Sequence, residues 1–495
     1  MPLQKNQVLT LRVERLSSDG SGVAHSPDGE TVFIPGAAPG DEARVRIVKD
    51  CKRYAFGILD EVLTPSPDRI PVDCAVAGPC GGCSLRHLDY AAELRAKQEN
   101  VADVFARIGG LDVPVLPIVG SPEVNRYRNK VQFPVGVDKS GKPCIGFYAG
   151  RTHRIVPCPD CRLQPGVLNE IGNALCAFFA EKGIQPYSEE TGRGLVRHIF
   201  LRRGAHSGQI MVCLVCTRAK LPSAEELCTR LKAQFAEITT ILLNVNAKNT
   251  NVILGTETHT LYGPGYIEDT LCGVPVQLGP LSFYQVNTLA AEQLYGIAAQ
   301  YAQLTPDDLL LDLYCGMGTI GLSMAAHCRE LIGVEIVPEA IESAKANAAR
   351  MGADVAAKSR FFCADAGQAA TRLAAEGLHP DIVMLDPPRK GCDEATLSAV
   401  VRMSPRRVVY VSCNPATAAR DAAWLEQNGY HAEKVQPVDL FPRTRHCEAV
   451  LLLTKLHVER HIEVDVSMDE LDVTAAESKA TYNEIRDYVW EHHQL

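Results

Sequence analysis

The N-terminal part of the chain alternates short apolar runs with turns rich in glycine and proline. Apolar positions recur within residues 9–16, 31–35, 42–50 and 54–63, and the segments between them include SSDGSG and PGAAPGD. Short strands separated by such turns are typical of a small β-barrel. We therefore predict an OB-like barrel over residues 1–62. The next segment, Thr64–Asp73, contains three prolines and is predicted to be a linker.

The middle of the chain mixes helical and strand patterns. Residues 91–110 are predicted to form a helix, because they end on Gly109 and Gly110, a helix-stop signal. One further helix-like run and three strand-like runs follow, over residues 166–183, 130–138, 209–217 and 238–246. These patterns predict a central α+β domain over residues 63–280.

After residue 280 the pattern changes to strands that alternate with helices. Apolar strand-like segments, each followed by a helical pattern, begin at residues 308, 330, 359, 381 and 406. This alternation predicts a doubly wound, Rossmann-like α/β sheet over residues 281–455. In the tail, residues 456–495, Thr474 and Glu477 have capping-box spacing, which predicts a helix over residues 475–491.

Composition limits the classes of protein that this chain can be. Its 495 residues suggest about three domains. Its 59 acidic residues against 50 Lys and Arg give a formal net charge of −9, which excludes a uniformly basic nucleic-acid coat protein. Ten acidic and three basic residues of the tail account for −7 of this charge. No long apolar run or signal-peptide pattern is visible, so we expect a cytoplasmic protein that does not enter a membrane.

In a reducing cytosol, eighteen cysteines indicate metal or catalytic sites and buried thiols rather than disulfides. The densest group is Cys74, Cys80 and Cys83. Three thiolates so close together suit an iron–sulfur cluster or a zinc ion. A fourth ligand is needed, and Cys158 and Cys161 are both candidates. A radical S-adenosylmethionine (SAM) enzyme is a rival interpretation, but it favours a three-residue first gap, and here the gap is five residues.

Chemically suited residues follow the ends of the predicted C-terminal strands. Gly316 and Gly318 lie in a turn after the first strand, where an open α/β sheet binds nucleosides. Glu335 ends the second strand, where its carboxylate can accept hydrogen bonds from a ribose. Asp365 ends the third strand, beside the expected position of an adenine. This order fits either NAD or SAM.

Further residues at the same edge indicate covalent chemistry. Asp386 ends the fourth strand, before two prolines and Arg389, where amino-group methyltransferases have an aromatic residue instead. Cys413 ends the fifth strand, where a thiolate can attack an electrophilic ring carbon. Glu448 precedes the closing apolar strand, which would return its carboxylate to the same edge as a separate base.

Together these motifs resemble those of the bacterial RNA (uracil-5)-methyltransferases, in particular the iron–sulfur branch that acts on 23S ribosomal RNA. The resemblance covers residues 1 to about 455. It implies that the barrel, with the sequences GSGVA and FIPG, is a TRAM domain that binds RNA, and that SAM is the methyl donor. It also implies that a [4Fe-4S] cluster is held by Cys74, Cys80, Cys83 and Cys161.

The resemblance also implies roles for the active-site residues. Cys413 is expected to be the nucleophile that adds to C6 of uracil, and Glu448 the base that removes the C5 proton. Phe283, in the sequence FYQVN, is expected near the target base. The residues expected to contact SAM are Gln285, Tyr314, Thr319, Glu335, Asp365 and Asp386. Thr319 stands where some members of the family have Asn.

Two basic stretches are candidates for RNA contacts. Residues 123–154 carry seven basic and two acidic residues, and residues 193–203 carry four arginines and no acid. Arg126, Arg128 and Lys130 are expected to contact phosphates. Transfer RNA stays open as an alternative to 23S rRNA, and the resemblance suggests a monomer. The other functions considered are a cytosine C5 methyltransferase, an iron–sulfur redox or radical SAM enzyme, and a binding module with an inactive enzyme fold.

Overall fold

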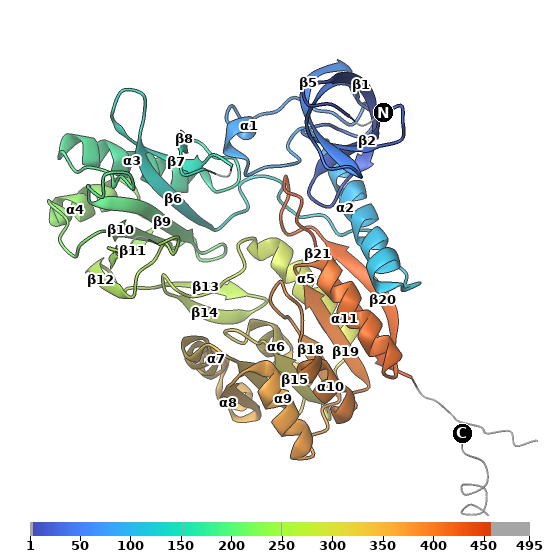
Figure 1. Ribbon diagram of the computed structural model, residues 1–495. Coiled ribbons are helices and arrows are strands. Elements are labelled where there is room, and N and C mark those ends of the chain that lie inside the picture. Colours follow the sequence, from blue (N-terminus) through green and yellow to red (C-terminus); the bar gives the residue numbers. More distant parts are fainter. Residues whose placement is uncertain (1–2, 151, 249, 457–495) are drawn as a thin grey trace, which may run out of the picture. The chain divides into compact units, whose positions relative to one another are not determined.

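The N-terminal barrel is present as predicted. The computed structural model describes residues 3–150, 152–248 and 250–456. Five strands close the barrel in the order β1-β2-β3-β5-β4, with β3 parallel to β5 (Figure 1). Alternating apolar side chains such as Val13, Val45 and Ile47 fill its interior. The strands are β1 (Val8–Leu16), β2 (Ser21–His25), β3 (Thr31–Pro35), β4 (Glu42–Asp50) and β5 (Tyr54–Thr64).

A long helix follows the barrel. The single turn α1 (Ala77–Cys80) comes first, and α2 (Tyr90–Val104) then continues through a π-helical turn (Phe105–Gly109) to Gly110. Gly110 has φ 63°, a left-handed conformation that glycine adopts at low cost, so the predicted helix stop is confirmed. Val101 and Phe105 pack with Leu425 in the hydrophobic core of the C-terminal sheet. This helix therefore belongs energetically to the C-terminal half of the chain.

The central domain is built on a seven-stranded sheet in the order β12-β11-β10-β9-β6-β7-β8. Helices α3 and α4 cover one face, and the opposite face contributes Phe200, Met211, Cys213 and Leu242 to the core of the C-terminal half. The two domains thus share apolar contacts rather than a loose linker. The elements are β6 (Lys130–Val137), β7 (Pro143–Tyr148), β8 (Ile155–Pro157), α3 (Gly166–Glu181), β9 (Val196–Arg203), β10 (Ile210–Cys216), α4 (Ala224–Gln234), β11 (Ile238–Val245) and β12 (Glu257–Tyr262).

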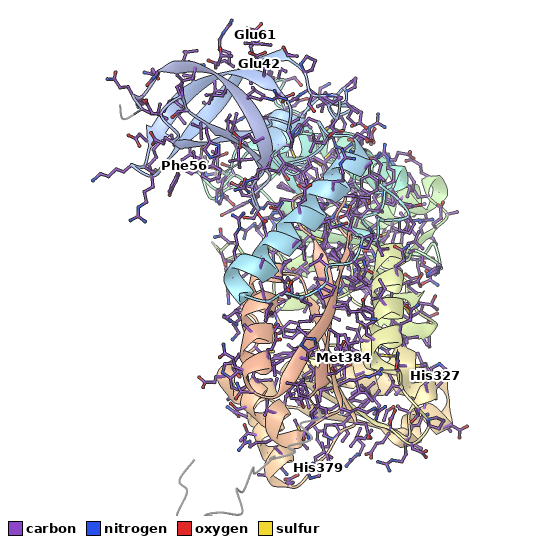
Figure 2. All side chains as sticks on the ribbon, turned by 90° about the vertical axis from the view of Figure 1, so that its right-hand side faces the viewer. Glu42, Phe56, Glu61, His327, His379 and Met384 are labelled. Atoms are coloured by element: carbon purple, nitrogen blue, oxygen red, sulfur yellow. The ribbon has the colours of Figure 1, made fainter. Side chains whose placement is uncertain are left out.

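The C-terminal sheet has seven strands in the order β17-β16-β15-β18-β19-β21-β20. The first five are parallel, as the sequence alternation predicted, and β21 is antiparallel to both of its neighbours. In Figure 2, Met384 of β18 lies within this sheet, and Phe56 and Glu61 lie on the barrel. The strands are β15 (Leu309–Leu313), β16 (Glu330–Glu335), β17 (Ser359–Cys363), β18 (Ile382–Leu385), β19 (Arg407–Ser412), β20 (Tyr430–Val438) and β21 (Glu448–Lys455).

The chain direction in this sheet creates a ligand crevice. From β15 the strand order proceeds to β16 on one side and to β18 on the other, and such a switch point is where open α/β sheets bind ligands. A two-stranded ribbon, β13 (Ile267–Leu271) and β14 (Val274–Leu278), packs into the same core. The helices are α5 (Thr288–Ala302), α6 (Thr319–Met324), α7 (Pro338–Met351), α8 (Ala353–Lys358), α9 (Ala366–Ala375), α10 (Glu394–Met403) and α11 (Pro415–Gln427), with a 3-10 turn at Ala325–His327.

Strand β20 had no counterpart in the sequence prediction. Its residues YHAEKVQPV alternate imperfectly, and Pro437 cannot donate a ladder hydrogen bond. The strand lies at the edge of the sheet, where such a residue is tolerated. The predicted helix over residues 475–491 lies outside the described residues. Within the described ranges, no helix is long and apolar enough to cross a membrane.

Candidate functional site

The glycine turn after β15 and the acidic end of β16 form one side of the crevice. Gly318 has φ 79°, and a Cβ there would lie 3.2 Å from the Cβ of Ala344, so the turn leaves little room for a side chain. The Glu335 carboxylate accepts hydrogen bonds from the backbone N–H groups of Gly316 (3.2 Å) and Val337 (3.0 Å). The turn and the acid, predicted separately from the sequence, are therefore directly connected.

One buried carboxyl group in this crevice was missed by the sequence analysis. Asp312, inside β15, is 1% exposed, and its Oδ2 accepts a hydrogen bond from the Gly321 N–H (3.0 Å). Its Oδ1 has no hydrogen-bond partner among the described residues. Burial raises the pKa of Asp312 to about 8, and the nearby Asp386 and Glu335 add to this rise. The available signal was an acid interrupting the apolar run LLLDL just before the glycine turn.

The carboxyl groups of Asp312, Glu335 and Asp386 indicate what kind of ligand the crevice accepts. Burial also raises the pKa of Asp386, to about 7. Carboxylates crowded in a poorly hydrated place repel one another, and a positive ligand relieves both the repulsion and the desolvation. A ligand with ammonium and sulfonium groups, as in SAM, has this complementarity.

Cys413 and Glu448 lie next to each other at the ends of neighbouring strands. In the antiparallel ladder Ser412, the last residue of β19, pairs with Ala449. Cys413, which follows Ser412, therefore faces Glu448, which precedes Ala449 as the first residue of β21. Burial raises the pKa of the Cys413 thiol, and Glu448 and Asp386 add to the rise, whereas Arg389 opposes it. The sequence prediction that these residues share one edge is therefore confirmed in geometry.

Glu448 is an unusually buried acid. Its residue is 6% exposed, and burial raises its pKa to about 8, with a contribution from Asp386 and an opposing one from Arg389. The loop that carries Arg389 is attached to the Cys413 loop, because Asn414 Nδ2 donates a hydrogen bond to the Arg389 carbonyl (2.9 Å). A thiol, two buried carboxyl groups with raised pKa values and one arginine can together support addition of the thiol to a substrate and a later proton removal.

The segment FYQVN projects an aromatic side chain beside this site. Phe283 is 71% exposed, so its ring is open to solvent and able to stack on another ring. Its loop is fixed from behind by Arg202, whose Nη1 and Nη2 donate to the carbonyls of Gly279 (2.9 Å) and Ser282 (2.7 Å). Asn129 Nδ2 donates to the carbonyl of Gln285 (2.7 Å). The aromatic residue is thus exposed on a rigid support.

Three other predicted SAM contacts have partners within the protein. The Thr319 hydroxyl lies 3.4 Å from the Tyr295 hydroxyl, in the core. Asp365 caps α9 by accepting from the Gln368 N–H (3.1 Å). Tyr314 has φ 66° and turns its hydroxyl toward Thr396 Oγ1, at 3.4 Å. The Thr319 and Tyr314 contacts join residues far apart in the sequence, whereas the Asp365 cap is local to the start of α9.

The predicted cluster cysteines line one cavity of about 250 Å³ between the α1 segment and the central sheet. Cys74, Cys80, Cys83 and Cys161 all face it, together with Cys158, which is 3% exposed. Within the described residues, no group of three or more His, Cys, Asp or Glu side chains is arranged to hold a single metal ion.

The cavity is also lined by cations. Arg86 is 3% exposed, and its Nη1 donates to Asp73 (2.7 Å) and Asn125 (3.0 Å), whereas Nε and Nη2 have no oxygen or nitrogen acceptor among the described residues. Burial raises the pKa of the Cys83 thiol, and the charge of Arg86 opposes this rise. Arg128 and Lys130, predicted as RNA contacts, line the same cavity. The cavity is therefore suited to an anionic group.

Other arginines of the basic stretches are occupied differently from the expectation. Arg126 donates to Asp160 (2.7 Å) and to the carbonyls of Cys161 (2.8 Å) and Gln164 (3.2 Å), so it supports the loop that carries Cys161. Arg197 donates to backbone carbonyls of the central domain. Arg202, described above, is 1% exposed. The expectation that the 193–203 stretch is an exposed phosphate-binding face is wrong for these two buried arginines.

The fold and the crevice define the class of protein. A doubly wound sheet with a glycine turn after its first strand, and acids and a cysteine at the following strand ends, is the architecture of a SAM-dependent methyltransferase domain. Sequence comparison makes this specific. The profile of the tRNA (Uracil-5-)-methyltransferase family matches residues 206–456, and that of the TRAM domain matches residues 2–59.

Individual relatives cover nearly the whole chain. Proteins described as uncharacterized RNA methyltransferases from Halalkalibacterium halodurans and Oceanobacillus iheyensis are 43% and 41% identical to it, over 91% and 92% of this chain and 98% of each relative. The Pyrococcus abyssi tRNA (uracil-54, C5)-methyltransferase in complex with S-adenosyl-L-homocysteine matches with a TM-score of 0.72 and 27% identity, covering 90% of this chain and 100% of that one. The chain belongs to the tRNA (uracil-5-)-methyltransferase family and is a SAM-dependent RNA methyltransferase.

We expect Asp312→Asn to stabilise the ligand-free protein as pH rises and to weaken SAM binding. The folded-state pKa of about 8 lies above the unfolded value of about 3.9, so folded Asp312 keeps a proton that the unfolded chain releases. Wild-type stability then falls by up to about 1.4 kcal/mol per pH unit between these values, and Asn removes this loss. Thermal unfolding at about pH 5.5 and about pH 8.5, with calorimetric titration of SAM, measures both effects.

The exposed Asp354→Asn serves as the control and should change neither property. A difference in melting temperature between Asp312→Asn and wild type that is the same at both pH values would contradict the burial argument.

Proposed function

We propose that this enzyme transfers the methyl group of SAM to C5 of a specific uridine in RNA, with 23S rRNA as the substrate. The observation that carries this proposal is the placement of Cys413 beside Glu448, next to the carboxylates that suit SAM. Methylation of an amine or a hydroxyl needs no thiol, because these groups are nucleophilic themselves. A ring carbon such as C5 of uracil must first be activated.

Covalent addition supplies that activation. The Cys413 thiol gives up its proton to solvent as its sulfur forms a bond to C6 of uracil, and the electron pair of the C5–C6 double bond moves onto the C5–C4–O4 enolate. C5 then attacks the SAM methyl carbon, and the sulfonium leaves as S-adenosylhomocysteine. Glu448 removes the remaining C5 proton, the C5–C6 double bond re-forms, and the sulfur of Cys413 leaves. The carboxylate is regenerated when Glu448 passes the C5 proton to solvent, and the thiol is regenerated when the departing thiolate takes a proton from solvent.

The other site residues have supporting roles in this proposal. Phe283 stacks on the flipped target base or its neighbour, since it is exposed on a fixed loop. Glu335 accepts from the ribose of SAM, and Asp312 and Asp386 face its positive groups. Gln285 and Tyr314 complete the pocket, whereas Thr319 and Asp365 contribute through α6 and α9, whose first turns they occupy.

We also propose that the cysteine cavity holds a [4Fe-4S] cluster bound by Cys74, Cys80, Cys83 and Cys161. Each cysteine of such a cluster binds a different iron atom, so the sulfurs need not converge on one point. The cavity volume, the four thiols and the buried Arg86 guanidinium beside Cys83 fit an anionic cluster. When bound, the cluster would cross-link α1 to the Cys161 loop, which makes its role structural. Arg128 and Lys130 then serve the cluster as well as RNA.

Two RNA classes remain distinct candidates. The cysteine set supports 23S rRNA through its resemblance to the iron–sulfur branch of the family. The similarity to the Pyrococcus abyssi tRNA (uracil-54, C5)-methyltransferase supports tRNA as the second candidate. Parallel reactions on 23S rRNA fragments and on tRNA transcripts, with methyl-labelled SAM and mass mapping of the labelled nucleotide, decide between them.

Two variants test the covalent mechanism. Cys413→Ala should lower the rate of label transfer to uridine by at least about 10³-fold, because the nucleophile is lost. Glu448→Gln should accumulate a methylated enzyme–RNA adduct, because the C5 proton stays and the thiol cannot leave. A denaturing gel of the variant after incubation with RNA and methyl-labelled SAM detects this adduct. Cys363→Ala, an exposed cysteine at the end of β17, is the control. Wild-type transfer by Cys413→Ala would exclude the mechanism, and label on cytosine would exclude the substrate.

The pH dependence tests Glu448 as the base. A base acts in its deprotonated form, so kcat/KM for RNA should rise with pH up to about 8, the pKa of Glu448 in the free enzyme. Below that value the rate should fall by about tenfold per pH unit. Initial rates across this range measure the profile. A rate that is flat or falls with increasing pH would contradict this assignment.

Adjacent cysteines offer a matched test of the cluster. Protein purified without oxygen should contain iron and sulfide with a broad visible absorption. Cys161→Ser should lose most of this iron, and Cys158→Ser should keep it. Iron and sulfide analysis with absorption spectra provides the measurement. Wild-type protein without iron, or equal iron in both variants, would contradict the proposed ligand set.

A further inference from the structure

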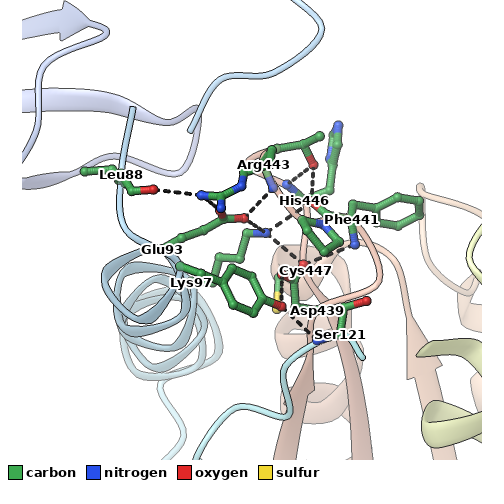
Figure 3. Close-up of polar contacts among 12 residues, drawn as sticks. Leu88, Glu93, Lys97, Ser121, Asp439, Phe441, Arg443, His446 and Cys447 are labelled. Carbon is green, nitrogen blue, oxygen red and sulfur yellow. Dashed lines mark hydrogen bonds and ion pairs between the residues drawn. The ribbon is translucent and has the colours of Figure 1, made fainter. Parts of the chain in front are cut away.

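A buried ionic network joins α2 to the turn that precedes the catalytic strand (Figure 3). Lys97 Nζ donates hydrogen bonds to Glu93 Oε1 (2.7 Å), to Asp439 Oδ1 (2.8 Å) and to the carbonyl of Phe441 (3.2 Å). Lys97 is 2% exposed, and both carboxylates are fully buried. Charges are placed in such a position at a large desolvation cost, so each depends on its partners for compensation.

The network meets the sheet one residue away from Glu448. In the ladder between β20 and β21, Val438 is paired with Glu448, and Asp439 directly follows Val438. The second oxygen of Asp439 accepts from the Tyr90 hydroxyl (2.9 Å), and its backbone N–H donates to the Val119 carbonyl (2.9 Å). The contact of Lys97 with Asp439 therefore fixes the end of the ladder from which Glu448 reaches the active site.

The rest of the turn 439–444 is held at successive backbone groups by distant parts of the chain. The Leu440 carbonyl accepts from Asn287 Nδ2 (3.0 Å), and the Pro442 carbonyl accepts from the Tyr127 hydroxyl (3.0 Å). The carbonyl of residue 443 accepts from the Leu85 N–H (3.1 Å). Asn287 belongs to FYQVN, so the turn also contacts the segment that carries Phe283.

One residue of the turn is held in a strained backbone conformation. Arg443 has φ 68°, which is costly for a residue with a side chain. Its N–H donates to Glu93 Oε1 (2.7 Å), and its Nη1 donates to the Leu88 carbonyl (2.7 Å). The acid that Lys97 compensates thus also maintains this conformation. A turn with a strained residue and several long-range partners has one well-defined geometry while its partners are intact.

We propose that Lys97, acting through Asp439 and Glu93, is a positioning residue for Glu448, and this inference rests on the proposed role of Glu448 as the base. Lys97 touches neither substrate nor the reacting atoms. It determines where the carboxylate lies when the C5 proton must be removed. Its loss should therefore slow that step and leave the binding of SAM and RNA unchanged.

The test compares Lys97→Met with Arg95→Met. Arg95 is exposed on the same helix and pairs with Asp68, so its variant loses a cation and an ion pair at the surface. For Lys97→Met, kcat should fall by about 10- to 100-fold. The KM for RNA and the calorimetric affinity for SAM should stay at wild-type values. A methylated covalent adduct should accumulate, as with Glu448→Gln. Arg95→Met should show none of these changes.

A milder variant covers the case in which Lys97→Met does not fold. Tyr127→Phe removes the hydrogen bond to the Pro442 carbonyl and leaves the charges in place, and it should give a smaller fall in kcat with detectable adduct. If Lys97→Met folds and shows wild-type kcat without adduct, this inference is overturned and the proposed function is not. If Lys97→Met does not fold, the same result with Tyr127→Phe overturns the inference. Absence of labelled uridine with the wild-type enzyme would overturn the proposed function, and this inference with it.

Discussion

The antiparallel return of β21 between β19 and β20 is the constraint on which the rest of the site depends. Five parallel strands bring glycines, acids and a cysteine to one edge of the sheet. If β21 were also parallel, its first residue, Glu448, would lie at the opposite edge. Because β21 begins at Glu448 and runs in the opposite direction, its first residue faces the residue that follows β19. The pairing of thiol and carboxylate is therefore a result of strand direction.

Burial gives this edge its chemical character. Asp312, Asp386 and Glu448 all have pKa values raised mainly by desolvation, and Arg389 offsets the effect for Glu448. Keeping these carboxyl groups buried, whether protonated or charged, costs free energy in the ligand-free protein. A positively charged methyl donor offsets that cost when it binds. Part of the affinity for the donor therefore comes from relief of the repulsion and desolvation already present in the folded protein.

Long-range polar contacts keep the catalytic elements in register. Lys97 supports the turn before β21, Arg202 supports the loop of Phe283, and Arg126 supports the loop of Cys161. Each of these cations is directed at backbone carbonyls or buried acids of a segment far away in sequence. The central sheet and α2 also share hydrophobic cores with the C-terminal sheet. The edge that holds Cys413 and Glu448 is therefore supported by α2 and the central sheet as well as by its own sheet.

The sequence by itself determined the barrel, the alternating α/β pattern, the glycine stop at Gly110 and the residues at the strand ends, because these follow from local periodicity and turn chemistry. The tertiary structure decided which cations face solvent and which do not. Arg126, Arg197 and Arg202 resemble exposed phosphate ligands in the sequence, since a basic residue on a loop or strand has the same pattern whether its side chain meets water or a carbonyl. β20 and the Lys97 network were likewise invisible, because they depend on contacts between residues far apart in the chain, and Asp312 showed only as an acid interrupting the apolar run LLLDL.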